Sequence, residues 1–430
     1  MNLFWFRRDL RLEDNAGLYY ALKEGKETLC VFIFDEEILS KLADPEDARV
    51  HFIYKTIVQL HQKISALGSA LIVKYGKPLN IIQDLCLEYP IEKVFTNNDY
   101  EPYARERDAA VKEYLEAKNI AFFSYKDQVI FEKEEVLNNS GTPYLVFTPY
   151  GRKWKEKLND FYLKSYPSLN YLNHLYKINK QDILSLHAIG FKTSALIFPD
   201  SDLPLERLHN YEHIRNLLWS TETSKLGVHL RFGTISIRQL VSYVKEHCAV
   251  YLNELIWREF FQMILWHFPE VVTQSFRKEF DHIEWRNNEQ EFEAWCHGNT
   301  GYPAVDAGMR ELNQSGFMHN RARMITASFL CKHLLIDWRW GEQYFAQKLL
   351  DYDLAANNGN WQWAAGTGCD AAPYFRIFSP AAQQKKFDPE AKYIRRWVPE
   401  YGSPAYPKPM VDHDLARARA LEVYKNGLMR

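Results

Sequence analysis

LCVFIF, at residues 29–34, is an unbroken apolar run with the length and composition of a buried β-strand. Four similar runs occur in the first part of the 430-residue chain: LFWF (3–6), ALIVKY (70–75), KVFTN (93–97) and IAFFSY (120–125). Helical patterns at residues 48–66 and 102–118 lie between them. Strands that alternate with helices predict an α/β domain over residues 1–127, built on a doubly wound, mostly parallel five-stranded sheet.

The pattern then changes twice along the chain. Residues 128–202 carry turn signals such as NNSGTPY (138–144), which predict a long connecting segment between two domains. From Leu203 onward, long amphipathic segments replace the strand signals. Residues 203–430 are therefore predicted to form an all-helical domain.

The composition is that of an ordinary globular protein, with 47% hydrophobic and 25% charged residues and a formal net charge of −2. So small a net charge gives no global argument for nucleic acid, and any DNA-binding surface must be a local basic patch. The six cysteines form no CxxC pair, and no metal site is expected. No apolar run reaches membrane-spanning length, and the N-terminus is charged from Arg7 onward, so we expect a cytoplasmic protein without a membrane partner.

The stretch AANNGNWQWAAGTGCDAAPYFRIFSP, residues 355–380, combines tryptophans, asparagines and glycines with almost no aliphatic residues. Glycine allows close backbone approach to a ligand, while amides and indoles supply directed hydrogen bonds and flat faces. This composition indicates a pocket for something flat and polar.

Three further segments allow a structural and a functional interpretation each. In LNELIWREFF (252–261), the residues Glu254, Trp257 and Arg258 share one face of a helix. The structural interpretation is a packing helix on which Glu254 is solvated or paired with Arg258. The functional interpretation is a carboxyl group that points into an aromatic cleft. In GFMHNRARMITASFL (316–330), Asn320, Arg323 and Met324 share a face that is either solvated or ligand-binding, while Arg321 points away. The element TSKLG (223–227) is either a helix cap or a diphosphate site.

Together these motifs resemble the photolyase/cryptochrome family over nearly the whole chain, and most closely the class I cyclobutane pyrimidine dimer photolyases. The resemblance implies a deoxyribodipyrimidine photo-lyase with a C-terminal FAD domain, which repairs pyrimidine dimers in UV-damaged DNA. In that reaction light drives an electron from reduced, anionic FAD to a dimer flipped out of the duplex, with no net redox change. We expect a monomer that works in the cytoplasm on the DNA, without an obligate protein partner.

The resemblance also implies roles for individual residues. Glu254 would hydrogen-bond a thymine carbonyl of the lesion, Trp257 would stack on it, Met324 would line its pocket and Asn357 would face the flavin nitrogen that is protonated on reduction. Residues implied to hold FAD are Tyr211, Thr223, Ser224, Lys225, Leu226, Gly227, Asn320, Arg323, Asp351, Asp353 and Asn357. Residues implied to contact DNA are Arg215, Glu254, Trp257, Arg258, Arg321, Trp363, Arg376 and Gln383. Trp361, Trp338 and Trp285 match the tryptophan chain that photoreduces oxidised flavin.

Three positions refine or depart from the family pattern. Gly227 stands where the family usually has serine, which removes one hydroxyl contact to the flavin phosphates. Asn357 favours a repair enzyme, because plant cryptochromes usually have Asp and animal ones Cys at this place. Val272 stands where a folate-type antenna site uses lysine, so the identity of a second chromophore, folate or deazaflavin, near Asn97, Asn98 and Glu101 stays open. The alternatives are a cryptochrome-like photoreceptor and, less favoured, a light-independent flavoprotein or a plain DNA-binding module.

Overall fold

The computed structural model describes residues 1–179 and 181–429. They form two compact units. Unit 1 comprises the described residues of 1–135, 154–202 and 225–252, and unit 2 comprises the described residues of 136–153, 203–224 and 253–430. No helix in the described part of the chain is long and apolar enough to cross a membrane.

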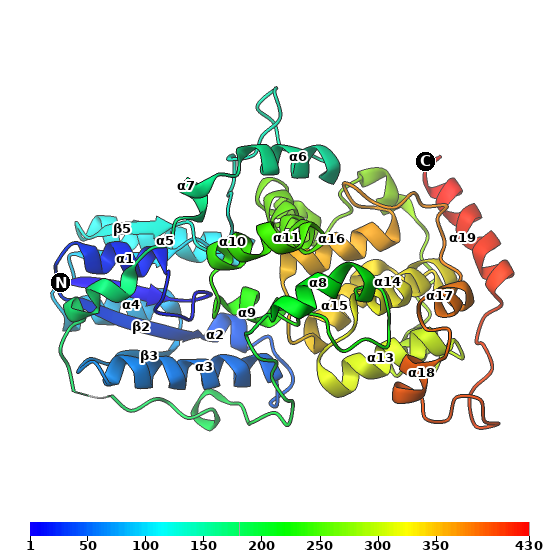
Figure 1. The fold of residues 1–430 in the computed structure, drawn as a ribbon, viewed down its shortest axis with the longest axis horizontal. Coiled ribbons are helices and arrows are strands. Elements are labelled where there is room, and N and C mark those ends of the chain that lie inside the picture. The colour runs from blue at the N-terminus through cyan, green and yellow to red at the C-terminus, as the bar shows by residue number, and fades with distance from the viewer. Residues whose placement is uncertain (180, 430) are drawn as a thin grey trace. The chain divides into compact units, whose positions relative to one another are not determined.

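Unit 1 contains the predicted five-stranded sheet, which confirms the doubly wound parallel fold (Figure 1). The strands are β1 (Asn2–Phe6), β2 (Thr28–Asp35), β3 (Leu71–Gly76), β4 (Lys93–Asn97) and β5 (Ala121–Tyr125). They lie in the order β3-β2-β1-β4-β5, and every neighbouring pair is parallel. Phe4 of β1 pairs with Cys30 on one side and with Phe95 on the other, so the central strand is buried.

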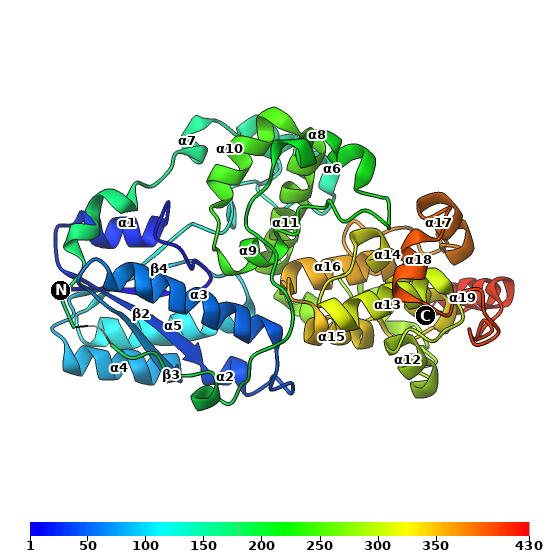
Figure 2. The ribbon, with the colours of Figure 1, turned by 60° about the horizontal axis from the view of Figure 1, so that its bottom comes forward.

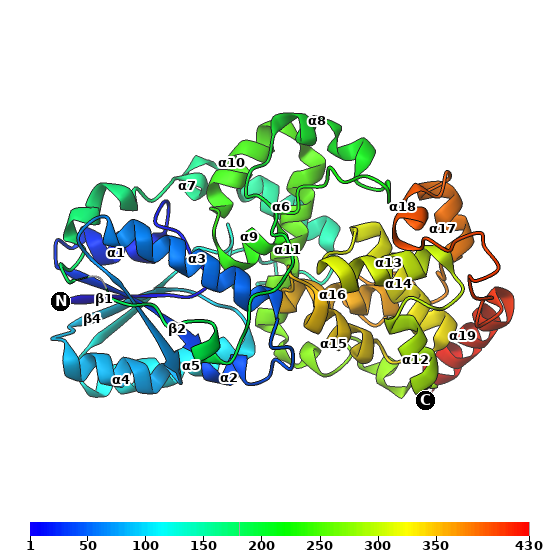
Figure 3. The ribbon, with the colours of Figure 1, turned by 90° about the horizontal axis from the view of Figure 1, so that it is seen from below.

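Helices cover both faces of this sheet. Figures 2 and 3 show α1 (Ala16–Lys23) and α3 (Ala48–Ser65) on one face, and α4 (Pro78–Glu88) and α5 (Pro102–Ala117) on the other. The strand order explains this division, because the chain steps outward from β1 to β3, returns to β4 and then steps the opposite way to β5. Right-handed crossovers place the helices of the two runs on opposite faces.

Unit 2 is mainly helical in its described residues, as predicted for the C-terminal part. Its helices are α8 (Leu205–Ile214), most of α11 (Ala249–His267), α12 (Glu289–Cys296), α13 (Pro303–Ser315), α14 (Asn320–Ser328), α15 (Trp338–Lys348), α16 (Leu354–Ala365), α17 (Pro380–Phe387), α18 (Lys392–Trp397) and α19 (His413–Gly427). The larger part of α6 (Phe147–Lys157) also belongs to unit 2.

The compact units follow different boundaries from the three predicted parts. Residues 136–153 of the predicted connector belong to unit 2, and residues 225–252 of the predicted helical domain belong to unit 1. The latter include α9 (Gly227–Phe232) and α10 (Ile237–His247). Arg238 of α10 shows why, because its guanidinium is buried between Asp14, at 3.0 Å, and Asp127, at 2.8 Å.

Candidate active site

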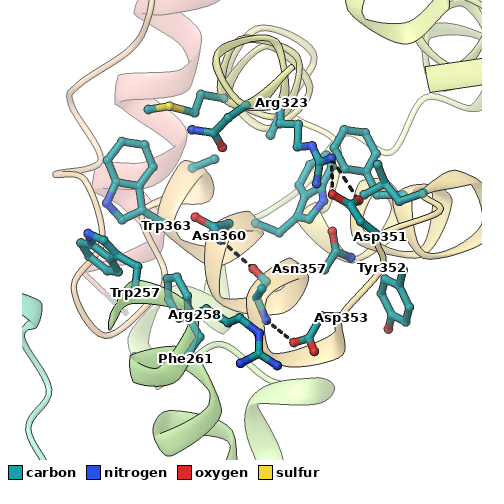
Figure 4. A pocket seen from close by; sticks show the side chains of 18 of the residues that line it. Trp257, Arg258, Phe261, Arg323, Asp351, Tyr352, Asp353, Asn357, Asn360 and Trp363 are labelled. Carbon is teal, nitrogen blue, oxygen red and sulfur yellow. Dashed lines mark hydrogen bonds and ion pairs between the residues drawn. The ribbon is translucent and has the colours of Figure 1, made fainter. Parts of the chain in front are cut away.

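A cavity of about 330 Å³ lies in unit 2, between α11, α14, α15 and α16 (Figure 4). Small-molecule sites range from roughly 300 to 1,000 Å³, so this cavity has the size of a ligand site. Its lining residues are Arg215, Glu254, Trp257, Arg258, Phe261, Asn320, Arg323, Met324, Ala327, Phe345, Leu349, Asp351, Tyr352, Asp353, Ala356, Asn357, Asn360, Trp361, Trp363 and Ala364. Most side chains that the sequence singled out in α11, α14 and α16 therefore meet in one place.

Helix α11 contributes a wall of the cavity through residues three and four positions apart. Glu254 and Trp257 both line it, as the functional interpretation of this face requires. Glu254 forms an ion pair with Arg215, whose Nη1 lies 2.6 Å from Oε1. The structural interpretation of this helix had offered Arg258 as a partner. Burial raises the pKa of Glu254, and the Arg215 guanidinium opposes that rise. The carboxyl group is thus held at the cavity by a cation from a separate segment.

The opposite side of the cavity carries an ion pair between α14 and the segment before α16 (Figure 4). Nη2 of Arg323 lies 3.0 Å from Oδ1 and 2.9 Å from Oδ2 of Asp351, a pairing that the family resemblance implies for these two residues. Nε of Arg323 donates to the backbone oxygen of Met318 at 2.9 Å, which fixes the guanidinium plane. Trp257 and Trp363 lie across the cavity from this pair (Figure 4).

Helix α14 begins at a histidine cap. His319 accepts a hydrogen bond from the backbone N of Arg321 at 3.1 Å, and burial together with Arg321 and Arg323 lowers its pKa to about 4. The imidazole is therefore neutral at pH 7 and can act as an acceptor at the helix N-terminus. This cap sets the helical phase that turns Asn320 and Met324 toward the cavity.

Arg321 points away from the cavity, as predicted, and lies in a cationic cluster. It donates to Oδ1 of Asn216 at 2.6 Å and lies 4.3 Å from the ring centroid of Phe387. Burial, Arg215 and Arg376 all lower the pKa of Arg321, so the charges of the three arginines act on one another. Because Arg215 also lines the cavity, this cluster marks a basic edge of the site.

Helix α16 carries Asp353 as its N-cap and Asn357 one turn later. Asp353 accepts from the backbone N of Ala356 at 3.2 Å, which caps the helix, and it also lines the cavity. Nδ2 of Asn357 donates to the backbone oxygen of Glu342 at 3.1 Å and to its Oε1 at 2.8 Å. With Nδ2 occupied, the amide oxygen is the part of Asn357 that remains to accept from a ligand N–H.

The three predicted electron-transfer tryptophans belong to one apolar cluster, with Trp285 at its partly buried margin. Trp361 is 2% exposed and packs edge-on against Phe345, with ring centroids 4.9 Å apart, and against Trp295, at 6.1 Å. Trp338 is buried, and Trp285 packs edge-on against Tyr424 at 5.8 Å. The direction of electron flow through them stays a prediction.

Several predicted site residues do not line the cavity in the described part of the chain: Tyr211, Thr223, Ser224, Arg321, Arg376 and Gln383. Lys225, Leu226 and Gly227 belong to unit 1, where Lys225 adopts a left-handed backbone (φ 52°) just before α9. The diphosphate role of TSKLG therefore stays a prediction.

The loop after β4, where an antenna site was expected, uses its polar side chains internally. Asn97 is buried, donates to Asp9 at 2.6 Å and accepts from the backbone N of Gly17 at 2.8 Å. Asn98 donates to Glu132 at 2.8 Å, and Glu101 accepts from Arg8 at 2.9 Å.

Two residues that hold site side chains in place were not predicted from the sequence. Glu342 holds Asn357, and Phe147 stacks on Trp257 with ring centroids 3.7 Å apart. Glu342 lies fifteen positions before its partner, and Phe147 lies in the predicted connector, so no periodic pattern links either pair.

Comparison with known proteins gives concordant results. Residues 2–169 match the family model described as DNA photolyase, and residues 251–404 match the model described as the FAD binding domain of DNA photolyase. A deoxyribodipyrimidine photo-lyase of Halobacterium salinarum is 35% identical, over 99% of this chain and 99% of that protein.

Two solved structures share the fold. A bacterial class III photolyase from Agrobacterium tumefaciens matches with a TM-score of 0.89 at 33% identity, over 100% of this chain and 98% of that chain. An archaeal photolyase from Sulfolobus tokodaii with two FAD molecules matches with a TM-score of 0.84 at 34% identity, over 99% of this chain and 100% of that chain.

These matches confirm the resemblance and the fold class expected from the sequence, although the bacterial structure represents class III, whereas the sequence favoured class I. The assignment to a class stays a prediction. With both family models matched and full-length relatives above 30% identity, the chain belongs to the DNA photolyase family.

Proposed function

We propose that this photolyase repairs cyclobutane pyrimidine dimers in DNA by light-driven electron transfer from reduced, anionic FAD to a flipped-out dimer. The observation that carries the proposal is the two-sided cavity. One side offers the flat faces of Trp257 and Trp363 beside the carboxyl group of Glu254, and the other offers the Arg323–Asp351 pair and Asn357. Such a cavity suits two flat ligands of different polarity held next to each other.

The polar side fits a flavin. Asn320, Arg323, Asp353 and Asn357 supply donors and acceptors for the edge of a flat ring, and the pair with Asp351 keeps Arg323 in place. Trp361 and Phe345 supply apolar walls. When bound there, FAD supplies the electron that light excitation releases. The family model for an FAD-binding domain covers these residues and supports the assignment.

The aromatic side would bind the lesion. Trp257 and Trp363 would stack on the pyrimidines, an interaction worth about 1–3 kcal/mol per base. Flipping costs a few kcal/mol in an intact duplex and less for a base pair that is already damaged, which favours lesions over normal sites.

Glu254 would hold a proton at a carbonyl oxygen of the lesion. A protonated carboxyl group can donate such a hydrogen bond, and the burial that raises the pKa of Glu254 favours the protonated form. Arg215 on Oε1 would leave Oε2 for the lesion. The pair therefore combines a phosphate-seeking cation with the group that stabilises negative charge on the dimer.

Asn357 distinguishes repair from photoreception. An amide whose Nδ2 is held by Glu342 presents an acceptor and no acidic proton, so it cannot protonate a bound cofactor as a carboxylic acid would. This supports a repair enzyme over a cryptochrome-like photoreceptor.

The remaining parts of the proposal concern partners. The arginines 215, 321 and 376 would bind phosphates around the lesion, and the protein would act on DNA as a monomer without an obligate protein partner. A second chromophore would serve as antenna, and the two FAD molecules in the Sulfolobus relative support looking for one.

A repair assay tests the proposal. The flavin-loaded protein is mixed with an oligonucleotide containing one thymine dimer, and intact thymines are measured after blue light and after darkness. We expect repair only in the light. Lesion binding without repair would favour a photoreceptor, and equal conversion in darkness would exclude a photochemical mechanism.

A further inference from the structure

Three phenylalanines surround the indole of Trp257. Phe147 stacks on it face to face, with ring centroids 3.7 Å apart and planes 6° apart. Phe260 packs edge-on at 5.6 Å, and Phe261 lies tilted at 5.5 Å. Of these three rings, Phe147 is the one that lies parallel to the indole and directly against it. Since Trp257 also lines the cavity, a part of the indole that Phe147 leaves uncovered can meet a ligand there.

Phe147 belongs to a different segment from the rest of this cluster. It is the first residue of α6, and its backbone N donates to Oδ2 of Asp370 at 3.0 Å. Asp370 follows α16, the helix that carries Trp363. Phe147 is half-buried and, among the described residues, is not part of the cavity lining, so it supports Trp257 from behind.

Gly151, one helical turn after Phe147, allows α6 to pack closely against the Phe147 ring and α11. A Cβ at that glycine would lie 3.5 Å from the Phe147 ring and 3.9 Å from the side chain of Ile256 on α11. The start of α6 therefore packs closely against α11 around these rings. The Asp370 hydrogen bond anchors the backbone of Phe147, and the packing of α6 on α11 limits the motion of its ring. The Phe147 ring therefore offers a fixed plane on which the Trp257 indole stacks.

We propose that Phe147 is a positioning residue, which fixes the plane of Trp257 for stacking on the lesion. The inference rests on the proposed function, because it assumes that the uncovered part of the Trp257 indole receives a pyrimidine. Without Phe147 the indole gains rotational freedom, and binding the lesion must then restrict that freedom. An aromatic contact of this kind is worth about three- to tenfold in an equilibrium constant.

Binding measured in the dark with the FAD-loaded enzyme tests the proposal. The variants are Phe147→Leu, Phe147→Tyr, Trp257→Ala and the double variant Phe147→Leu/Trp257→Ala, with Phe161→Ala as a control. Phe161 is 78% exposed on α7 (Asp160–Leu163), outside the cluster. Each variant is titrated with a thymine-dimer oligonucleotide and with the undamaged one, and repair per bound lesion is measured afterwards in blue light.

We expect Phe147→Leu to raise Kd for the dimer oligonucleotide about three- to tenfold, with Kd for undamaged DNA and repair per bound lesion unchanged. Phe147→Tyr should restore wild-type binding because it keeps the ring. The double variant should bind like Trp257→Ala, because Phe147 acts through that indole.

Additive losses in the double variant, equal losses on both oligonucleotides, or unchanged binding by Phe147→Leu would each overturn the proposal. A purely structural role would also lower flavin content and thermal stability in Phe147→Leu, and would not discriminate damaged from undamaged DNA. If Trp257→Ala itself binds the dimer normally, the proposed lesion site fails, and that result is separate from any result on Phe147 alone.

Discussion

Arg215 and Glu254 form an ion pair at the edge of the cavity, with Nη1 of the arginine 2.6 Å from Oε1 of the glutamate. Arg215 also belongs to the cluster with Arg321 and Arg376. The pair therefore links the surface proposed to bind phosphates with the group proposed to contact the lesion.

Glu254→Gln is expected to lower the repair yield severalfold and to change lesion affinity by less than about twofold, because the amide keeps the size and hydrogen-bonding capacity of the side chain. Quantum yield under blue light and Kd in the dark measure the two effects separately. An undiminished yield would remove the proposed role.

The repair yield should also fall as the pH rises through the pKa of Glu254. Burial raises that pKa, so the proton is bound below it and is lost above it. Arg215 opposes the rise, so Arg215→Gln should move the midpoint to higher pH. In Glu254→Gln this pH dependence should disappear. A midpoint that Arg215→Gln leaves in place would contradict the coupling.

Trp361→Phe is expected to abolish photoreduction of oxidised flavin while sparing repair by chemically reduced enzyme. Trp361 is the predicted chain member that lines the cavity, whereas Trp338 and Trp285 are not among its described lining residues. Flavin absorbance during blue illumination measures photoreduction. Normal photoreduction in this variant would move the entry point to another aromatic residue.

Arg321→Gln should weaken binding to damaged and undamaged DNA and reduce the salt dependence of log Kd by about 0.9 in log–log slope, the contribution of one phosphate contact. If all three clustered arginines bind phosphates, log Kd of the wild type should rise with log salt concentration with a slope of about 2.7. Titrations from low to moderate salt measure it. Lys112→Gln, at an exposed position on α5 in unit 1, serves as the control and should leave the slope unchanged.

Gly341→Ala should destabilise the protein by about 1–3 kcal/mol, the usual effect of overpacking a core. A Cβ at this position would lie 2.1 Å from the indole of Trp361. Urea unfolding measures the change in free energy. Gln343→Ala, at an exposed position on the same helix, should have little effect. Equal stability of both variants would show that Trp361 moves aside without cost.

Lys332 should make the free energy of unfolding rise with pH above neutrality. Its side chain is 1% exposed, with Nζ 2.7 Å from the backbone oxygen of Ala365 and 3.6 Å from the ring centroid of Tyr424. Burial lowers its pKa to about 7, against an ordinary value of 10.5. Between these values the unfolded chain binds the proton more strongly, so the folded state gains stability as pH rises. Urea unfolding at pH 7 and pH 9 should show a smaller increase for Lys332→Met than for the wild type.

The sequence predicted those parts of the molecule that depend on local patterns. Strands such as β2 are recognisable in the sequence as apolar runs, and the shared face of Glu254 and Trp257 follows from helical spacing. Long-range pairs carry no local pattern. The ion pair of Glu254 and Arg215 joins residues thirty-nine positions apart in the sequence, and that of Arg238 and Asp127 joins residues 111 positions apart. Neither pair could be predicted from sequence spacing.

The division into compact units also depends on long-range contacts that a local pattern does not carry. Residues 136–153 have the composition of a loop, but Phe147 buries a face against Trp257, and this contact ties the segment to unit 2. The family resemblance supplied roles for residues on α11, α14 and α16 and the pairing of Asp351 with Arg323. It did not identify Glu342 or Phe147, which hold Asn357 and Trp257.

Between Ala355 and Ala365, helix α16 has no continuous solvent-facing stripe, and its exposed residue Asn360 lines the cavity. From Ala355 to Ala365 every residue is buried or lines the cavity, except Gly359, where an added Cβ would lie 2.1 Å from the ring of Phe261. A helix with a solvent-facing stripe can accumulate neutral substitutions there over evolutionary time. A substitution between Ala355 and Ala365 requires changes in the surrounding side chains as well, so these eleven positions should diverge more slowly among descendants of this gene than those of α19.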